Sequence, residues 1–114
     1  MHVGFIGLGN VGAKLAGSLL RNGKQLSVFD LDPALVAGFV AQGARSGTSP
    51  AQLMRDCDVV ITCLPSPAAC EAVVNEMMPE VRAGKIWMEM STTDAVEVAR
   101  LATEVQAKGG QAGE

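Results

Sequence analysis

The chain has 114 residues, of which 48% are hydrophobic and 13 are glycine, and this composition suits one close-packed α/β domain with many tight turns. Its net charge of −3 and pI of about 5.1 argue against a nucleic-acid or membrane-surface partner. No apolar run approaches the roughly 18 residues of a membrane span.

Two further features bear on location and metals. The chain enters an apolar run at residue 3 with no basic leader before it, so the sequence does not read as a signal peptide. Cys57, Cys63 and Cys70 are odd in number, lack paired spacings and accompany a single His. These features predict reduced thiols, no metal site and a cytoplasmic protein.

The most informative stretch is the beginning of the chain. Residues 3–6 have the length and composition of a buried strand, and they are followed at once by Gly7-x-Gly9-x-x-Gly12. From Asn10 onward the apolar residues recur at helical spacing. A strand, a glycine turn and a helix in this order predict a dinucleotide-binding site, although a glycine turn that binds nothing remains the alternative.

Each glycine in this motif has a separate expected role. Gly7 permits the tight turn out of the strand, and Gly12 lets the helix pack closely on the sheet. Gly9 has no side chain to hold a pyrophosphate away from the backbone. The pyrophosphate would then contact unpaired N–H groups at the helix N-terminus, where the helix dipole also favours negative charge.

The rest of the chain alternates between predicted strands and helices. Helix starts are indicated by Asp32-Pro33, Ser49-Pro50 and Ser66-Pro67, each with a capping side chain before a proline. The predicted helices cover residues 10–21, 33–42, 50–56, 67–78 and 94–107, and the predicted strands cover residues 3–6, 25–29, 44–46, 58–64 and 85–90. Residues 111–114 are too short and polar to assign.

This alternation predicts a doubly wound, mostly parallel sheet with helices on both faces, a three-layer Rossmann-type α/β fold. The expected strand order is 3-2-1-4-5(-6), with the ligand over the carboxyl ends of strands 1 and 4, where the order reverses. The whole of residues 1–114 is expected to form this one cofactor-binding domain.

Asp30 forms the second part of the dinucleotide motif. It follows Gly12 by 18 positions and ends the second predicted strand, close to the spacing of roughly 20 expected for the acidic residue on the adenosine ribose. A carboxylate there accepts hydrogen bonds from ribose hydroxyls and repels a 2′-phosphate, and Leu31 offers no positive charge to offset it. NAD is therefore favoured over NADP, and a plain turn-capping Asp is the alternative.

Several segments together resemble the β-hydroxyacid dehydrogenases, in particular the cofactor domain of 3-hydroxyisobutyrate dehydrogenases and tartronate semialdehyde reductases, relatives of 6-phosphogluconate dehydrogenase. The similarity spans all 114 residues. Leu64-Pro65 after the fourth strand and Ser91-Thr92 after the fifth are more specific than the glycines, since other dinucleotide folds lack that combination. These segments are Gly4–Gly12, Val28–Asp30, Gly43–Ala44, Asp58–Pro65 and Ser91–Thr93.

The resemblance implies roles for individual residues. Leu64 and Pro65 match a loop whose backbone lies beside the nicotinamide-side ribose, although Pro65 also serves simply to end a strand. Thr92 matches the hydroxyl residue near the nicotinamide ring, with Ser91 beside it, although both also suit a helix cap. The complete set of expected cofactor contacts is Gly7, Leu8, Gly9, Asn10, Val11, Gly12, Asp30, Leu31, Cys63, Leu64, Pro65, Ala69, Ser91 and Thr92.

The resemblance also implies an activity, the transfer of hydride between NAD and a small β-hydroxy acid. In the family, the segment matching Gly109–Glu114 runs into a substrate loop and a helical domain that carries the catalytic Lys. We therefore expect this sequence to be part of a larger oxidoreductase, with its catalytic residues and homo-oligomer contacts elsewhere. A nucleotide-binding or regulatory module without catalysis is the main alternative, and a methyltransferase-type site is disfavoured by Gly12.

A last expectation concerns self-association. If the substrate domain normally continues from the last helix and strand, apolar surface around Val98, Leu101, Val105 and Ala112 would be exposed in this chain. Such a patch would favour dimers or larger species.

Overall fold

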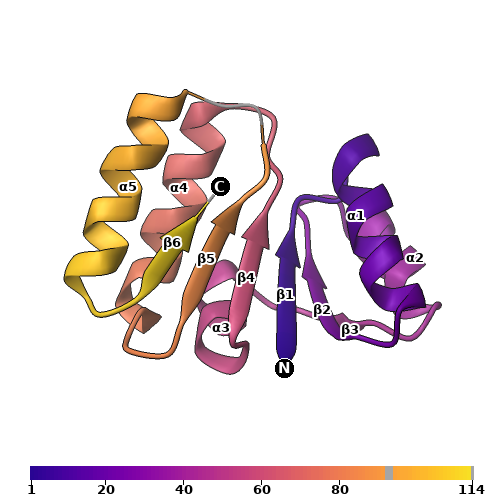
Figure 1. The fold of residues 1–114 in the computed structure, drawn as a ribbon. Coiled ribbons are helices and arrows are strands. Elements are labelled where there is room, and N and C mark those ends of the chain that lie inside the picture. Colours follow the sequence, from indigo (N-terminus) through magenta and orange to yellow (C-terminus); the bar gives the residue numbers. More distant parts are fainter. Residues whose placement is uncertain (92–93, 114) are drawn as a thin grey trace.

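The computed structural model describes residues 1–91 and 94–113, which form a single six-stranded sheet in the order β3-β2-β1-β4-β5-β6 (Figure 1). Every neighbouring pair of strands is parallel. The strands are β1 (His2–Ile6), β2 (Gln25–Phe29), β3 (Arg45–Ser46), β4 (Val59–Thr62), β5 (Ile86–Glu89) and β6 (Gln111–Gly113). The predicted doubly wound topology is confirmed.

Each crossover between strands contains a helix, as parallel pairing requires. The predicted starts at Pro33, Pro50 and Pro67 are confirmed as first helical positions. The helices are α1 (Asn10–Arg21), α2 (Pro33–Val40), α3 (Pro50–Asp56), α4 (Pro67–Met77) and α5 (Ala95–Ala107), and a 3₁₀ turn, η1 (Met78–Glu80), follows α4.

The sequence pattern does not assign the short strand β6. It pairs with β5 in parallel, with Gln111 opposite Ile86 and Gly113 opposite Met88. Only three residues long and polar, it has no hydrophobic alternation that could identify it. Its place at the edge of the sheet is determined by pairing with β5 and by the tight turn that follows α5.

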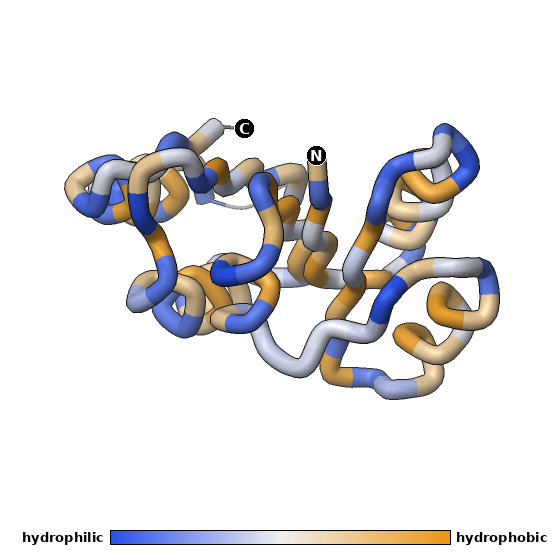
Figure 2. Tube along the Cα trace, turned by 90° about the horizontal axis from the view of Figure 1, so that it is seen from below, coloured by the Kyte–Doolittle hydropathy of each residue, from blue (hydrophilic) through white to orange (hydrophobic). Residues whose placement is uncertain are grey.

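Two apolar clusters hold the three layers together. Side chains of α1 and α2 pack on one face of the sheet, and those of α3, α4 and α5 pack on the other. Because side chains alternate along a strand, Phe5 belongs to the first cluster and the adjacent Ile6 to the second. Figure 2 shows hydrophobic residues along the strands and recurring between hydrophilic ones in the helices.

The predicted apolar patch near the C-terminus is wrong. Val98, Leu101 and Val105 are at most 5% exposed and belong to the larger of the two clusters, while Ala112 is partly buried against it. They form the inner face of α5, which covers β5 and β6 within this chain. The expectation of self-association loses this basis.

At the amino edge of the sheet, opposite the carboxyl ends of the strands, polar groups are paired. The buried Lys85 ammonium donates to the carbonyl oxygens of Arg55 and Cys57, both at 2.8 Å, and so caps the end of α3. The His2 backbone N–H donates to the Asp58 carboxylate at 2.8 Å. Among the described helices, none combines the length and the hydropathy that a membrane span requires.

Candidate cofactor-binding site

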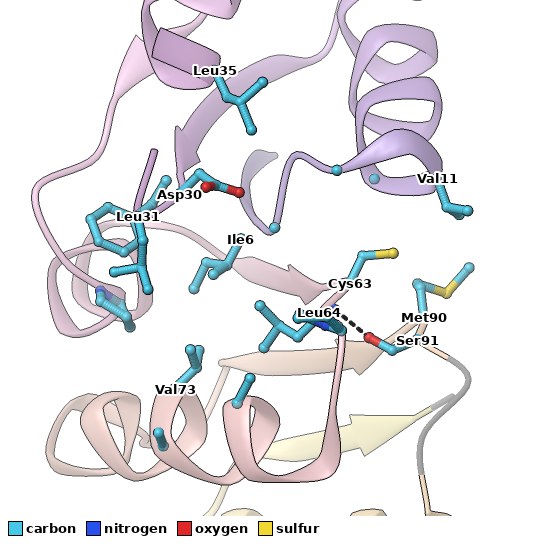
Figure 3. A pocket seen from close by; sticks show the side chains of 18 of the residues that line it. Ile6, Val11, Asp30, Leu31, Leu35, Cys63, Leu64, Val73, Met90 and Ser91 are labelled. Carbon is cyan, nitrogen blue, oxygen red and sulfur yellow. Dashed lines mark hydrogen bonds between the residues drawn. The ribbon is translucent and has the colours of Figure 1, made fainter. Parts of the chain in front are cut away.

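A cleft of about 710 Å³ lies over the carboxyl ends of β1 and β4, at the point where the strand order reverses. Its walls come from both halves of the chain, with the turn after β1 and the end of β2 facing the ends of β4 and β5 (Figure 3). The predicted contact residues that line it are Gly7, Gly9, Asn10, Val11, Gly12, Asp30, Leu31, Cys63, Leu64, Pro65, Ala69 and Ser91.

The three glycines of the turn serve distinct structural purposes. Gly7 has a φ of +101° in the left-handed region, and a Cβ there would lie 2.1 Å from the Cys63 carbonyl oxygen. A Cβ on Gly12 would lie 1.9 Å from the Gly7 carbonyl oxygen, so Gly12 allows close packing of helix against turn. A Cβ on Gly9 would meet nothing within 4 Å. Gly9 thus leaves open space on the cleft side of the turn.

The N-terminus of α1 differs from those of the other α-helices in the described part of the chain. Gly9 is its N-cap residue, and no side chain accepts a hydrogen bond from its first N–H groups. The other four helices are each capped by a side chain: Asp32, Ser49, Ser66 or Asp94. The unpaired N–H groups of α1 therefore face the cleft with the positive end of the helix dipole, which suits an anionic group.

Asp30 lies directly after the end of β2 and lines the cleft beside the glycine turn. One carboxylate oxygen accepts a hydrogen bond from the Leu8 backbone N–H and the other from the Asp32 backbone N–H, both at 2.8 Å. The turn-capping role is therefore present, and it anchors the glycine turn to the end of β2. Each oxygen retains a further lone pair for a ribose hydroxyl.

Leu8 does not line the cleft. Its side chain is 1% exposed and belongs to the apolar cluster under α1 and α2, while its N–H donates to Asp30. Its contribution to the site is to hold the glycine turn in place from below.

The other wall is held together by a link between the ends of β4 and β5. The Leu64 backbone N–H donates to the Ser91 hydroxyl at 2.5 Å, and both residues line the cleft (Figure 3). Pro65 follows directly and precedes the Ser66 cap of α4. The predicted contact Thr92 lies outside the described residues.

Cys63 is half-buried in this wall. Burial raises the pKa of its thiol, and the negative charge of Glu89 raises it further. A thiol that resists ionisation is a poor nucleophile, so Cys63 contributes to this wall as a neutral side chain.

Sequence reasoning missed part of the lining. One helical face of α4 carries Ala72, Val73 and Glu76 into the cleft beside the predicted Ala69. Ala72 and Val73 follow Ala69 by three and four positions, in a helix whose start the sequence did identify. That spacing was the available signal. The other lining residues not predicted are Ile6, Phe29, Leu35, Pro50 and Met90.

Among the described residues, no Lys or His lines the cleft, and no group of three His, Cys, Asp or Glu side chains could hold a metal ion. A glycine turn, an uncapped helix N-terminus and an acidic residue at the end of β2 meet at the reversal of strand order. Together they define a dinucleotide-binding domain of the Rossmann type.

Comparison with known proteins identifies the family. Residues 2–112 match the family model described as the NAD binding domain of 6-phosphogluconate dehydrogenase, and the chain belongs to this family. It is 35% identical over 111 residues to the mitochondrial 3-hydroxyisobutyrate dehydrogenase of Drosophila melanogaster. It is 32% identical over 112 residues to the human cytokine-like nuclear factor N-PAC.

These matches cover 96% of the chain but only 34% of the Drosophila enzyme and 20% of human N-PAC. Among solved structures, the Mycobacterium tuberculosis 3-hydroxyisobutyrate dehydrogenase superposes with a TM-score of 0.90 at 24% identity, covering 98% of this chain and 39% of that one. This last likeness supports the fold alone. The predicted relationship to the 3-hydroxyisobutyrate and 6-phosphogluconate dehydrogenases is confirmed.

Proposed function

We propose that the cleft binds NAD, with the pyrophosphate at the N-terminus of α1, the adenosine ribose at Asp30 and the nicotinamide toward Leu64, Pro65 and Ser91. The observation that carries this proposal is that α1 alone among the described α-helices lacks a side-chain cap and opens into the cleft at Gly9. A pyrophosphate supplies the missing hydrogen-bond acceptors.

The preference for NAD over NADP follows from the charge at the adenosine end. A 2′-phosphate would lie against the Asp30 carboxylate, and Leu31, which is 92% exposed, provides no positive charge. Loss of one charge-assisted contact has a scale of about 1–3 kcal/mol. Replacing Asp30 by Ser together with Leu31 by Arg should narrow or reverse the preference, and equal affinities of the wild type for NAD and NADP would contradict this assignment.

The larger protein would be an oxidoreductase acting on a small β-hydroxy acid. When bound, NAD would accept or donate the hydride. This chain would orient the dinucleotide between the glycine turn and the Leu64–Ser91 wall. A general acid/base is still needed at the substrate hydroxyl, and Lys85 cannot serve, because its ammonium is bonded at the opposite edge of the sheet. A Lys from another part of the protein would supply this group.

The direct test replaces Gly9 by Val and measures NAD binding by calorimetric titration. The new methyl groups would occupy the space expected for the pyrophosphate, and binding should be lost while the circular dichroism spectrum and melting temperature barely change. Gly38 in α2 is the matched control, because a Cβ there also meets nothing within 4 Å. Unchanged affinity in Gly9→Val would show that the ligand is not on this turn.

A second function is favoured by the similarity to N-PAC, whose name describes a nuclear factor. In this case the chain would bind a dinucleotide as part of a regulatory module without catalysis. The two functions predict the same binding to this domain and differ in turnover. Oxidation of a β-hydroxy acid by the whole protein would support the dehydrogenase, and tight NAD binding with no turnover of any such acid would support the module.

A further inference from the structure

A buried carboxylate lies directly behind the cleft wall that Leu64 and Ser91 form after the ends of β4 and β5. Glu89, the last residue of β5, is 3% exposed. One of its carboxylate oxygens is hydrogen-bonded to the Thr62 hydroxyl at 2.5 Å and to the Cys70 thiol at 3.0 Å. The other accepts from the Ser91 backbone N–H at 2.5 Å. The described residues form no salt bridge with it.

The directions of these hydrogen bonds can be assigned from chemistry. The Trp87 indole N–H, which only donates, is 2.9 Å from the Thr62 hydroxyl oxygen, so the single Thr62 proton is directed to Glu89. Burial raises the pKa of the Cys70 thiol, and the hydrogen bond to Glu89 and its charge raise it further, so the thiol keeps its proton to donate. Three donors thus converge on Glu89, an arrangement that suits a negatively charged, acceptor-only carboxylate.

This carboxylate is connected to the cleft through one residue. The Ser91 N–H is held by Glu89, and the Ser91 hydroxyl in turn accepts from the Leu64 N–H (Figure 3). Its charge also reaches the cleft, since Glu89 is the second cause of the raised pKa of the Cys63 thiol, and Cys63 lines the same wall. Glu89 therefore acts on the site in two ways, by fixing the wall and by its electric field.

We propose that Glu89 is a positioning residue that biases the site toward the oxidised cofactor. The oxidised nicotinamide ring is positively charged and the reduced ring is neutral. A buried negative charge behind the Leu64–Ser91 wall therefore stabilises the oxidised form relative to the reduced form. This inference rests on the proposed function, because it requires a nicotinamide dinucleotide with its ring at the Leu64–Ser91 wall.

The test compares the dissociation constants of NAD⁺ and NADH, by calorimetry and by NADH fluorescence, in the wild type and in Glu89→Gln. Removing the charge should lower the ratio of the NADH constant to the NAD⁺ constant by roughly threefold to tenfold, the scale of one partly screened charge. Glu89→Asp retains the charge and should keep the wild-type ratio. Glu104→Gln is the matched control, since it removes an exposed carboxylate on α5 that forms an ion pair with Arg100 and lies outside the Glu89 network.

Ser91→Ala separates position from charge. It removes the acceptor for the Leu64 N–H while Glu89 stays in place, so both dissociation constants should rise by the same factor with their ratio unchanged. Ser91→Ala can be measured even if Glu89→Gln fails to fold. A shift of the NADH-to-NAD⁺ ratio of dissociation constants in Ser91→Ala would overturn the electrostatic role of Glu89. An unchanged ratio in a folded Glu89→Gln that binds both forms would overturn it equally. A wild type that binds neither form would instead refute the proposed function.

Discussion

The two halves of the domain build the site by different physical means. In the half formed by β1, β2, β3, α1 and α2, the site consists of backbone that glycines leave uncovered, anchored by the single carboxylate of Asp30. In the half formed by β4, β5, β6, α3, α4 and α5, the wall of the site is held by a buried chain of polar side chains that ends at Ser91.

This difference determines which changes each half tolerates. The half that contains β1 and α1, here called the glycine half, depends on the absence of side-chain atoms at Gly7, Gly9 and Gly12. Adding a methyl group there is the damaging change. The half that contains β4 and β5, here called the polar half, depends on a complete set of buried hydrogen bonds. Removing a single donor or acceptor is the damaging change there, because its partner is left buried and unpaired. Three variants test this contrast.

The largest effect is expected for Gly12→Ala. The added Cβ would lie 1.9 Å from the Gly7 carbonyl oxygen, a backbone atom that cannot rotate away. We expect the free energy of unfolding to fall by about 3 kcal/mol or more, measured by urea denaturation. Gly9→Ala is the matched control and should leave it unchanged, because that Cβ meets nothing within 4 Å. Equal losses in both variants would show that close packing at Gly12 is not what the motif requires.

An intermediate effect is expected for Thr62→Val in the polar half. This nearly isosteric change leaves the Trp87 indole N–H without its acceptor and removes one donor from Glu89, both in the buried core. We expect a loss of about 1–3 kcal/mol in the free energy of unfolding. Thr62→Ser, which keeps the hydroxyl, should lose less than Thr62→Val. The reverse order would mean that the methyl group matters more than the hydrogen bonds.

The smallest effect is expected at alkaline pH and concerns Cys57, which follows α3 in the polar half. Burial raises the pKa of the Cys57 thiol from its ordinary value of 9.0 to about 11. The unfolded chain therefore releases this proton at lower pH than the native one, and stability declines as pH rises from about 9 to about 11. Replacing Cys57 by Ala should make this decline shallower in denaturation curves taken across the range. If Cys57→Ala loses stability with pH as steeply as the wild type, the Cys57 thiol is not the cause of the decline.

The same contrast explains how much could be predicted from the sequence. The features of the glycine half that the sequence revealed are local: Gly7, Gly9 and Gly12 lie within one turn, and the Asp32 cap precedes its helix directly. The bond from the Leu8 N–H to Asp30, across 22 positions, was not among them. Patterns of neighbouring residues report such features well. The strand order follows as well, because alternating strands and helices leave few ways to wind a parallel sheet.

The polar network of the second half could not be predicted this way. Glu89 forms hydrogen bonds with Thr62 and Cys70, which lie 27 and 19 positions away in the sequence, so no local sequence pattern could predict these contacts. The inward position of Val98 and Leu101 depended likewise on β6, a strand too short and polar to identify. Sequence reasoning failed where the structure is determined by distant parts of the chain.

The central claim is that one dinucleotide spans both halves, and an amide-resolved NMR titration tests it most directly. AMP should shift the amides of the glycine half, among them Leu8, Gly9 and Leu31, and leave the wall of the other half unchanged. NAD⁺ should shift these and also Cys63, Leu64 and Ser91, with one shared dissociation constant for both sets. NAD⁺ shifts confined to one half, or two sets with different constants, would contradict the account.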